Sequence, residues 1–135
     1  MKVAELKGPL LDVWVASCAD PIDVELVRNE WGFWMYDRRD EEEFGIPVWG
    51  DLPDTIERIY RPSYSWGQGG PIIEREKIAT TWAPFAGCWY AMILGTTALE
   101  VKISATAETP LLAAMRAYVA SKHGEDLPSE VPIAD

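Results

Sequence analysis

The sequence predicts an α+β fold, a small antiparallel sheet packed by an N-terminal and a C-terminal helix in a single domain. The first observation is residues 110–123, whose apolar side chains recur at helical spacing. The second is a set of extended segments rich in β-branched and aromatic residues, paired by short turn sequences. The third is the length of 135 residues with 48% hydrophobic and 25% charged residues, which suits one globular domain.

The N-terminal third contains one expected helix and one expected hairpin. Gly8 followed by Pro9 indicates a helix start, and apolar residues then follow at helical spacing as far as Asp20-Pro21. Residues 24–28 and 31–39 read as two strands of a hairpin. Four acidic residues stop the second strand, and residues 45–53, with two prolines and two glycines, read as loop.

The middle of the chain contains a glycine-rich loop. Before it, Asp54 and Glu57 fit a capping box, so residues 55–60 read as a helical turn, although an extended reading is nearly as good. Three glycines at positions 67, 69 and 70 permit unusual backbone angles or a close approach to the main chain. Pro71 suits the first position of a short helix that continues to Ile78.

The C-terminal half predicts three strands and the clearest helix. Residues 80–82 are extended, residues 88–94 form an apolar run, and residues 99–105 alternate, with a turn at 95–97 between the last two. Thr109 and Pro110 indicate a helix start, and His123 with Gly124 marks its end. We expect one globular domain over residues 1–124, followed by a mobile acidic tail over 125–135.

Composition excludes several classes of function. The net charge of -10 argues against direct binding to nucleic acid, which needs clustered Lys and Arg. No apolar run approaches the roughly 20 residues of a membrane span, and no signal peptide is visible, so we expect a cytoplasmic protein without membrane contact. Cys18 and Cys88 stand alone and read as buried thiols, and no metal site or cofactor is expected.

Familiar catalytic signatures are missing, which favours a binding protein over an enzyme. There is no phosphate-binding Gly-x-x-x-x-Gly-Lys loop, no His-Glu-x-x-His and no Gly-x-Ser-x-Gly elbow. The single histidine, His123, is better explained as a cation near a helix C-terminus than as a catalytic group. No catalytic residue is assigned.

The central loop is the expected ligand site. Free N–H groups at a helix start, Arg61 and Arg75 suit a phosphate, Tyr64 or Trp66 suits stacking on a base, and Gln68 suits reading its edge. The full expected site is Arg61, Tyr64, Trp66, Gly67, Gln68, Gly69, Gly70, Pro71 and Arg75. An alternative of about equal weight is structural: Trp66 fills the core beside the first helix, the glycines only turn the chain, and Arg75 pairs with a neighbouring acid.

Two segments resemble the signatures of the NinX-like phage protein family: WGQGGPIIERE at residues 66–76 and TPLLAAMRAYVASK at residues 109–122. The opening residues 1–16 are also similar to the start of that family, whereas residues 41–60 look like an insertion into its pattern. The resemblance implies an accessory protein of bacteriophages or prophages that acts in a host cell. It supplies no catalytic residues.

These observations lead to one preferred function and two alternatives. The preferred one is a non-enzymatic module that binds a small anionic or nucleotide-like ligand, with sequestration of a host defence signal suggested by analogy to other small phage proteins. The first alternative is a module that binds a host protein, and the second is a small hydrolase. Seven tryptophans in so short a chain predict exposed aromatic side chains and therefore a homo-oligomer.

Overall fold

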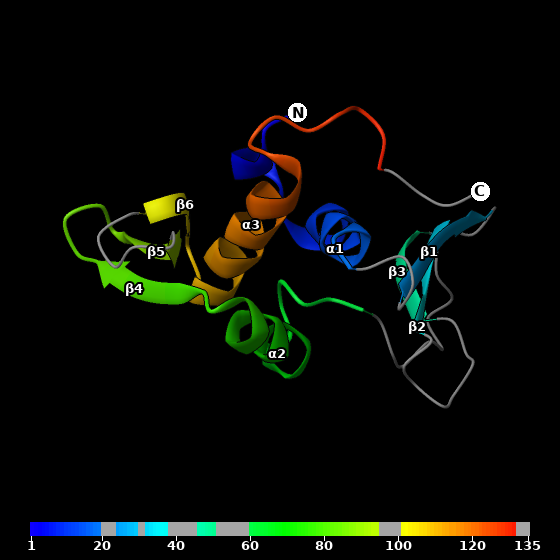
Figure 1. Ribbon diagram of the computed structural model, residues 1–135, viewed down its shortest axis with the longest axis horizontal. Helices are drawn as coiled ribbons and strands as arrows, with labels where there is room; N and C mark the ends of the chain where they lie inside the picture. The colour runs from blue at the N-terminus through cyan, green and yellow to red at the C-terminus, as the bar shows by residue number, and fades with distance from the viewer. Residues whose placement is uncertain (20–23, 30–31, 38–45, 51–59, 95–100, 132–135) are drawn as a thin grey trace.

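The computed structural model describes residues 1–19, 24–29, 32–37, 46–50, 60–94 and 101–131 (Figure 1). In chain order its elements are η1 (Val3–Glu5), α1 (Gly8–Ser17), β1 (Val24–Asn29), β2 (Gly32–Asp37), β3 (Ile46–Gly50), α2 (Trp66–Glu76), β4 (Ala79–Ala83), β5 (Cys88–Leu94), β6 (Val101–Ala107) and α3 (Pro110–His123). The α+β prediction is confirmed.

Helix α3 is the centre of the molecule and has the predicted ends. The Thr109 hydroxyl oxygen accepts a hydrogen bond from the Leu112 N–H at 3.1 Å, and Pro110 occupies the first position, where its missing N–H costs nothing. Gly124 ends the helix at φ 86°, and its N–H donates to the Ala120 carbonyl. Residues 111–120 are all buried. Alanines on this helix let neighbouring elements approach closely.

The sheet β4–β5–β6 packs one face against α3. All of its strands are antiparallel, with Trp82 opposite Trp89 and Tyr90 opposite Thr106. Ala91 and Ala107 are buried in the same core cluster as Met115, so the sheet and α3 share one apolar core. The predicted strand pairing is confirmed, while the predicted turn at 95–97 lies outside the described residues.

A second antiparallel sheet, β1–β2–β3, lies on the other side of the helices (Figure 1). The predicted hairpin of β1 and β2 is confirmed. The prediction of a loop over residues 45–53 is wrong for residues 46–50, because they form β3, which pairs with β2; residues 45 and 51–53 lie outside the described residues. Pro47 is tolerated in this strand because β3 is an edge strand and the pairing shifts register between Phe33 and Trp34. The sequence therefore encodes two small sheets, of which β3 completes the first.

Helix α2 begins earlier than predicted. It starts at Trp66, not at Pro71, and Pro71 lies inside it. Pro71 cannot donate to the Gly67 carbonyl, but both residues are exposed, so water can satisfy that oxygen. The glycines at 67, 69 and 70 are absent from the residues with positive φ, so the predicted ligand-facing loop is a helix.

The surroundings of Gly69 leave no room for a side chain at this position of α2. A Cβ on Gly69 would meet the Pro62 carbonyl oxygen and lie 2.5 Å from the Leu111 Cδ1 atom. The glycine therefore allows α2 to lie close against α3. Trp66 is 57% exposed and does not fill the core. The predicted turn over residues 55–60 falls outside the described residues, apart from Tyr60.

Helix α1 links the two halves of the fold and is shorter than predicted. It ends at Ser17 instead of near Asp20, with the Cys18 N–H bonded to the Val15 carbonyl in a tighter final turn. Its residues Leu11, Trp14 and Val15 join the core around α3, while Val13 and Ala16 join a smaller core under β1–β3.

The N-terminal residues pair with the segment that directly follows α3. The Leu127 N–H donates to the Met1 carbonyl at 2.8 Å, Leu127 is buried, and Lys2 forms an ion pair with Asp126. The start of the acidic tail is thus anchored on the N-terminal residues, and the mobility of the tail stays a prediction.

Candidate functional site

A pocket of about 820 Å³ opens where the helices begin, a volume in the range of small-molecule sites. Its lining comes from four segments: the start of α1, the strand β3, the turn before α2 and the start of α3. The lining residues are Lys7, Gly8, Pro9, Asp12, Val48, Arg61, Ser63, Tyr64, Glu108, Thr109 and Leu112. We call this the helix-start pocket.

Two helix N-termini border the pocket, and a third lies next to it. Lys7 and Thr109 are the N-cap residues of α1 and α3, and Tyr64 immediately precedes Ser65, the N-cap of α2. The N-terminus of a helix carries partial positive charge and unsatisfied N–H groups, which attract anions. The helix ends therefore add positive potential to a pocket in which the acids Asp12 and Glu108 balance the formal charges of Lys7 and Arg61.

The turn from residue 61 to residue 65 is held by hydrogen bonds at both ends. The Arg61 carbonyl accepts from the N–H groups of Tyr64 at 3.0 Å and Ser65 at 2.8 Å. The Arg61 N–H donates to the Gln68 Oε1 atom at 2.6 Å, so a side chain of α2 holds the start of the turn. The Arg61 guanidinium lies 5.4 Å from the centre of the Tyr64 ring. These contacts place a cation and an exposed aromatic ring together at the pocket.

Asp12 is the buried charge of the pocket, at 3% exposure. Its Oδ1 atom accepts from the Ser63 N–H at 2.9 Å, which ties α1 to the turn. Burial raises the pKa of Asp12 to about 6, although the Ser63 hydrogen bonds and the Arg61 charge act to lower it. A carboxyl group that titrates near neutral pH is a frequent property of functional sites.

The structure separates the predicted site residues. Arg61 and Tyr64 line the helix-start pocket, and Gln68 supports them through the Arg61 N–H. Arg75 lies on the last turn of α2, about 14 Å along the axis from Trp66. There its guanidinium donates to the Tyr118 hydroxyl at 3.3 Å and lies 3.7 Å from Glu76. Trp66, Gly67, Gly69, Gly70 and Pro71 do not line the pocket.

Sequence reasoning missed several pocket residues, among them Lys7, Asp12, Ser63 and Thr109. Lys7 and Thr109 flank helix starts that the sequence did reveal, through Pro9 and Pro110. Their convergence depends on tertiary packing, so no local pattern could have shown it. A single aspartate in the apolar run of α1 was the one available signal for Asp12.

A second polar cluster lies where α1 and α3 end. The Ser17 hydroxyl lies 3.1 Å from the His123 Nε2 atom and donates to the Trp14 carbonyl at 2.6 Å. Because its proton is already given to that carbonyl, Ser17 is not arranged as an activated nucleophile. Burial lowers the pKa of His123, which favours the neutral ring over the cation expected from sequence. This cluster is best explained as a link between helix ends.

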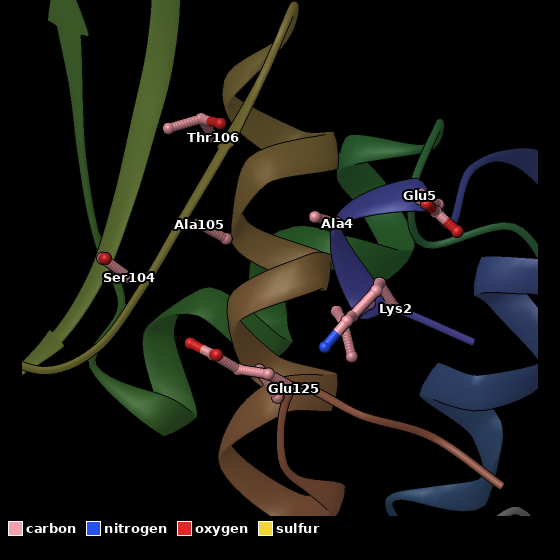
Figure 2. A pocket seen from close by; sticks show the side chains of 9 residues that line it. Lys2, Ala4, Glu5, Ser104, Ala105, Thr106 and Glu125 are labelled. Carbon is pink, nitrogen blue, oxygen red and sulfur yellow. The ribbon is translucent and has the colours of Figure 1, made fainter.

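A smaller pocket of about 350 Å³ separates η1 from β6. Figure 2 shows Ser104, Ala105 and Thr106 of β6 on one side, Lys2, Ala4 and Glu5 on the other, and Glu125 below them. Its one lysine, Lys2, is paired with Asp126, and two glutamates border the space. This pocket is less suited to an anion than the helix-start pocket.

Among the residues the structure describes, no helix has the length and apolarity needed to cross a membrane, and no group of three His, Cys, Asp or Glu side chains is arranged to hold a metal ion.

Comparisons with known proteins place the chain in a family. No curated protein matches the sequence. The family described as bacteriophage P22 NinX matches residues 2–122, nearly the whole chain, as the resemblance of residues 66–76 and 109–122 implied. The chain belongs to the bacteriophage P22 NinX family.

Proposed function

We propose that this phage protein is a non-enzymatic binding module for a small phosphate-bearing, nucleotide-like ligand, held in the helix-start pocket. The observation that carries the proposal is the meeting of helix N-termini with Lys7 and Arg61 around one space of ligand size. Backbone N–H groups and a guanidinium together are a common means of holding phosphate.

The residues suggest how such a ligand lies. Its phosphate faces Lys7 and Arg61, while its base stacks on Tyr64, a residue that is 78% exposed. The acids Asp12 and Glu108 also line the pocket and balance the formal charge of the two basic side chains. Selective binding of the anion therefore depends on the helix ends, and the acids are available to accept hydrogen bonds from ligand donor groups.

The test is calorimetric titration with a panel of mono-, di- and cyclic nucleotides. Arg61→Gln is expected to weaken binding by about tenfold or more, since a charge-assisted hydrogen bond is worth roughly 1.5 to 3 kcal/mol. Tyr64→Ala is expected to weaken the binding of nucleotides more than the binding of inorganic pyrophosphate, because only nucleotides have a base that stacks on the Tyr64 ring. Arg75→Gln is the matched control: the same change on the far end of α2, outside the pocket.

Two results would count against this proposal. One is the absence of binding by every phosphate compound in the panel. The other is an equal loss of affinity for Arg61→Gln and Arg75→Gln, which would move the site away from the pocket. In a phage protein, a ligand of this class would be a host nucleotide signal that the protein sequesters, and competition with a host receptor for the bound nucleotide tests that extension.

A second candidate function is recognition of a host protein, favoured by the exposed indole of Trp66 at the start of α2. Aromatic side chains of this kind are enriched at binding hot spots. Trp66 does not line the pocket, so Trp66→Ser separates the two functions. It is expected to leave nucleotide titrations unchanged, whereas loss of a host-protein complex in this variant alone would favour the second candidate.

A further inference from the structure

The outer edge of β4 differs from the other sheet edges that the structure describes. Ala79, Thr80, Thr81 and Trp82 are all exposed, and no described strand pairs with their outer side (Figure 1). No charged residue occurs between Lys77 and Glu100. A sheet edge of this kind leaves main-chain N–H and C=O groups available for pairing with another strand.

The other described edges each carry a feature that blocks pairing. In the first sheet, β1 contains Glu25 and Arg28, and β3 contains Pro47. In the second sheet, β6 contains Lys102 and has a register shift opposite Leu94. Charges, prolines and irregular pairing are the usual means by which proteins protect sheet edges.

The β6 edge is also covered. The Thr106 carbonyl accepts a hydrogen bond from the Arg116 guanidinium at 2.8 Å, and η1 lies across the smaller pocket from the strand (Figure 2). The β4 edge has neither protection, although it belongs to the same sheet. This contrast within one sheet indicates that β4 is left open for a partner.

We propose that β4 pairs with β4 of a second copy of the chain, in antiparallel orientation, and so forms a continuous six-stranded sheet across a two-fold axis. A two-fold axis perpendicular to the sheet keeps each side chain on its own face of the sheet. Residues that stand opposite one another therefore both have odd numbers or both have even numbers. Centring the axis on Thr81 is the arrangement that pairs all five residues of the strand.

This register is self-complementary. Thr81 stands opposite Thr81 of the second copy, and Ala79 stands opposite Ala83. Thr80 stands opposite Trp82, which places a β-branched residue against a half-exposed indole. Threonine pairs and pairs of aromatic with β-branched residues stabilise antiparallel sheets. No charge meets a like charge at this edge, in spite of the net charge of -10.

The occupant is therefore a second copy and not an unrelated strand. The complementarity needs no sequence from elsewhere, and it covers the indole of Trp82, which the monomer leaves exposed. The β4 interface is separate from the proposed ligand site, because β4 contributes no residue to the helix-start pocket.

Light scattering after size exclusion, at tens of micromolar chain, tests the proposal. The wild-type chain is expected to have twice the chain mass, and Thr81→Lys is expected to halve that mass, because two lysines then oppose each other at the axis. Thr106→Lys is the matched control, since Thr81 and Thr106 are both exposed and flank Tyr90 on its two neighbouring strands. This control is expected to stay dimeric.

A charge swap fixes the register. Thr81→Glu alone is expected to be monomeric, and mixing it with Thr81→Lys is expected to restore the doubled mass through opposite charges across the axis. Thr81→Cys is expected to form a disulfide-linked dimer on oxidation, because directly opposed residues lie within disulfide range. Thr106→Cys and the wild type are not expected to form this cross-link.

Three results would overturn the proposal. They are a wild-type mass of one chain, monomers from Thr106→Lys as well as Thr81→Lys, and a Lys and Glu mixture that stays monomeric. Melting curves of the variants decide whether a lost dimer reflects unfolding, and the charge-swap mixture decides between a lost interface and a damaged strand.

Discussion

At the scale of single residues, two neighbouring glycines of α2 have opposite surroundings. A Cβ at Gly69 would meet the Pro62 carbonyl and the Leu111 side chain, whereas a Cβ at Gly70 has no atom within 4 Å. Neither residue has a positive φ angle, so an alanine at either position has an allowed backbone. The pair therefore separates the cost of lost space from the gain in helix propensity.

Gly69→Ala is expected to destabilise the fold by about 1 to 3 kcal/mol, since the Pro62 carbonyl belongs to the main chain and cannot rotate away. Gly70→Ala is expected to stabilise it by about 0.5 to 1 kcal/mol, as alanine does in a helix interior. Urea unfolding of both variants measures the difference. Similar effects at the two positions would mean that α2 does not lie against α3 as described.

Asp12 predicts a pH dependence of stability. Burial raises its pKa to about 6, so between its ordinary pKa and this value the folded chain keeps a proton that the unfolded chain has lost. Stability from this group therefore falls as pH rises from about 4 to about 6, and is level above that window. The whole fall amounts to roughly 3 kcal/mol.

Asp12→Asn removes this titration while an amide oxygen can still accept from the Ser63 N–H. Urea unfolding is therefore expected to give stability curves for wild type and variant that differ in slope between about pH 4 and about pH 6 and run parallel above this window. Curves that run parallel throughout would show that the Asp12 carboxyl keeps its ordinary pKa.

At the scale of elements, local signals were enough for α3 and for the strand pairs. Thr109, Pro110 and Gly124 act within one or two turns of their own positions, so the sequence alone located both ends of α3. Strand β3 was missed because its identity depends on pairing with β2, which tolerates Pro47 through a register shift. The early start of α2 was missed because Gly69 is explained by Leu111, a residue distant in sequence.

The same distinction applies to the candidate site. Arg61 and Tyr64 were predicted because their chemistry is visible in a short segment beside a helix start. Lys7, Asp12 and Thr109 join them only through the packing of α1 and α3. Arg75 belongs to the same segment as Arg61, but α2 carries it away from the pocket, to the last turn of the helix. Proximity in sequence was thus a poor guide once the loop proved to be helical.

At the scale of the whole molecule, the two sheets have separate cores joined by α1. The larger core surrounds α3, and the smaller one contains Val13, Ala16, Val24, Leu26, Met35 and Val48. Among the contacts between described elements, the first sheet meets the rest of the fold mainly through α1. A unit with a small core and few external contacts is expected to open at lower free energy than the main core.

Two methionines, one in each core, test this expectation by hydrogen exchange. Met35 and Met115 are both buried, so truncation to alanine is expected to cost about 2 to 5 kcal/mol at each site. Met35→Ala is expected to speed exchange in β1, β2 and β3 and to leave α3 and β5 protected, because the larger core does not contain Met35. Met115→Ala is expected to speed exchange in both sheets, since α1 depends on α3 for its packing. Equal acceleration of all elements by Met35→Ala would mean that the two cores unfold as one cooperative unit, with α1 transmitting the loss from the small sheet to α3.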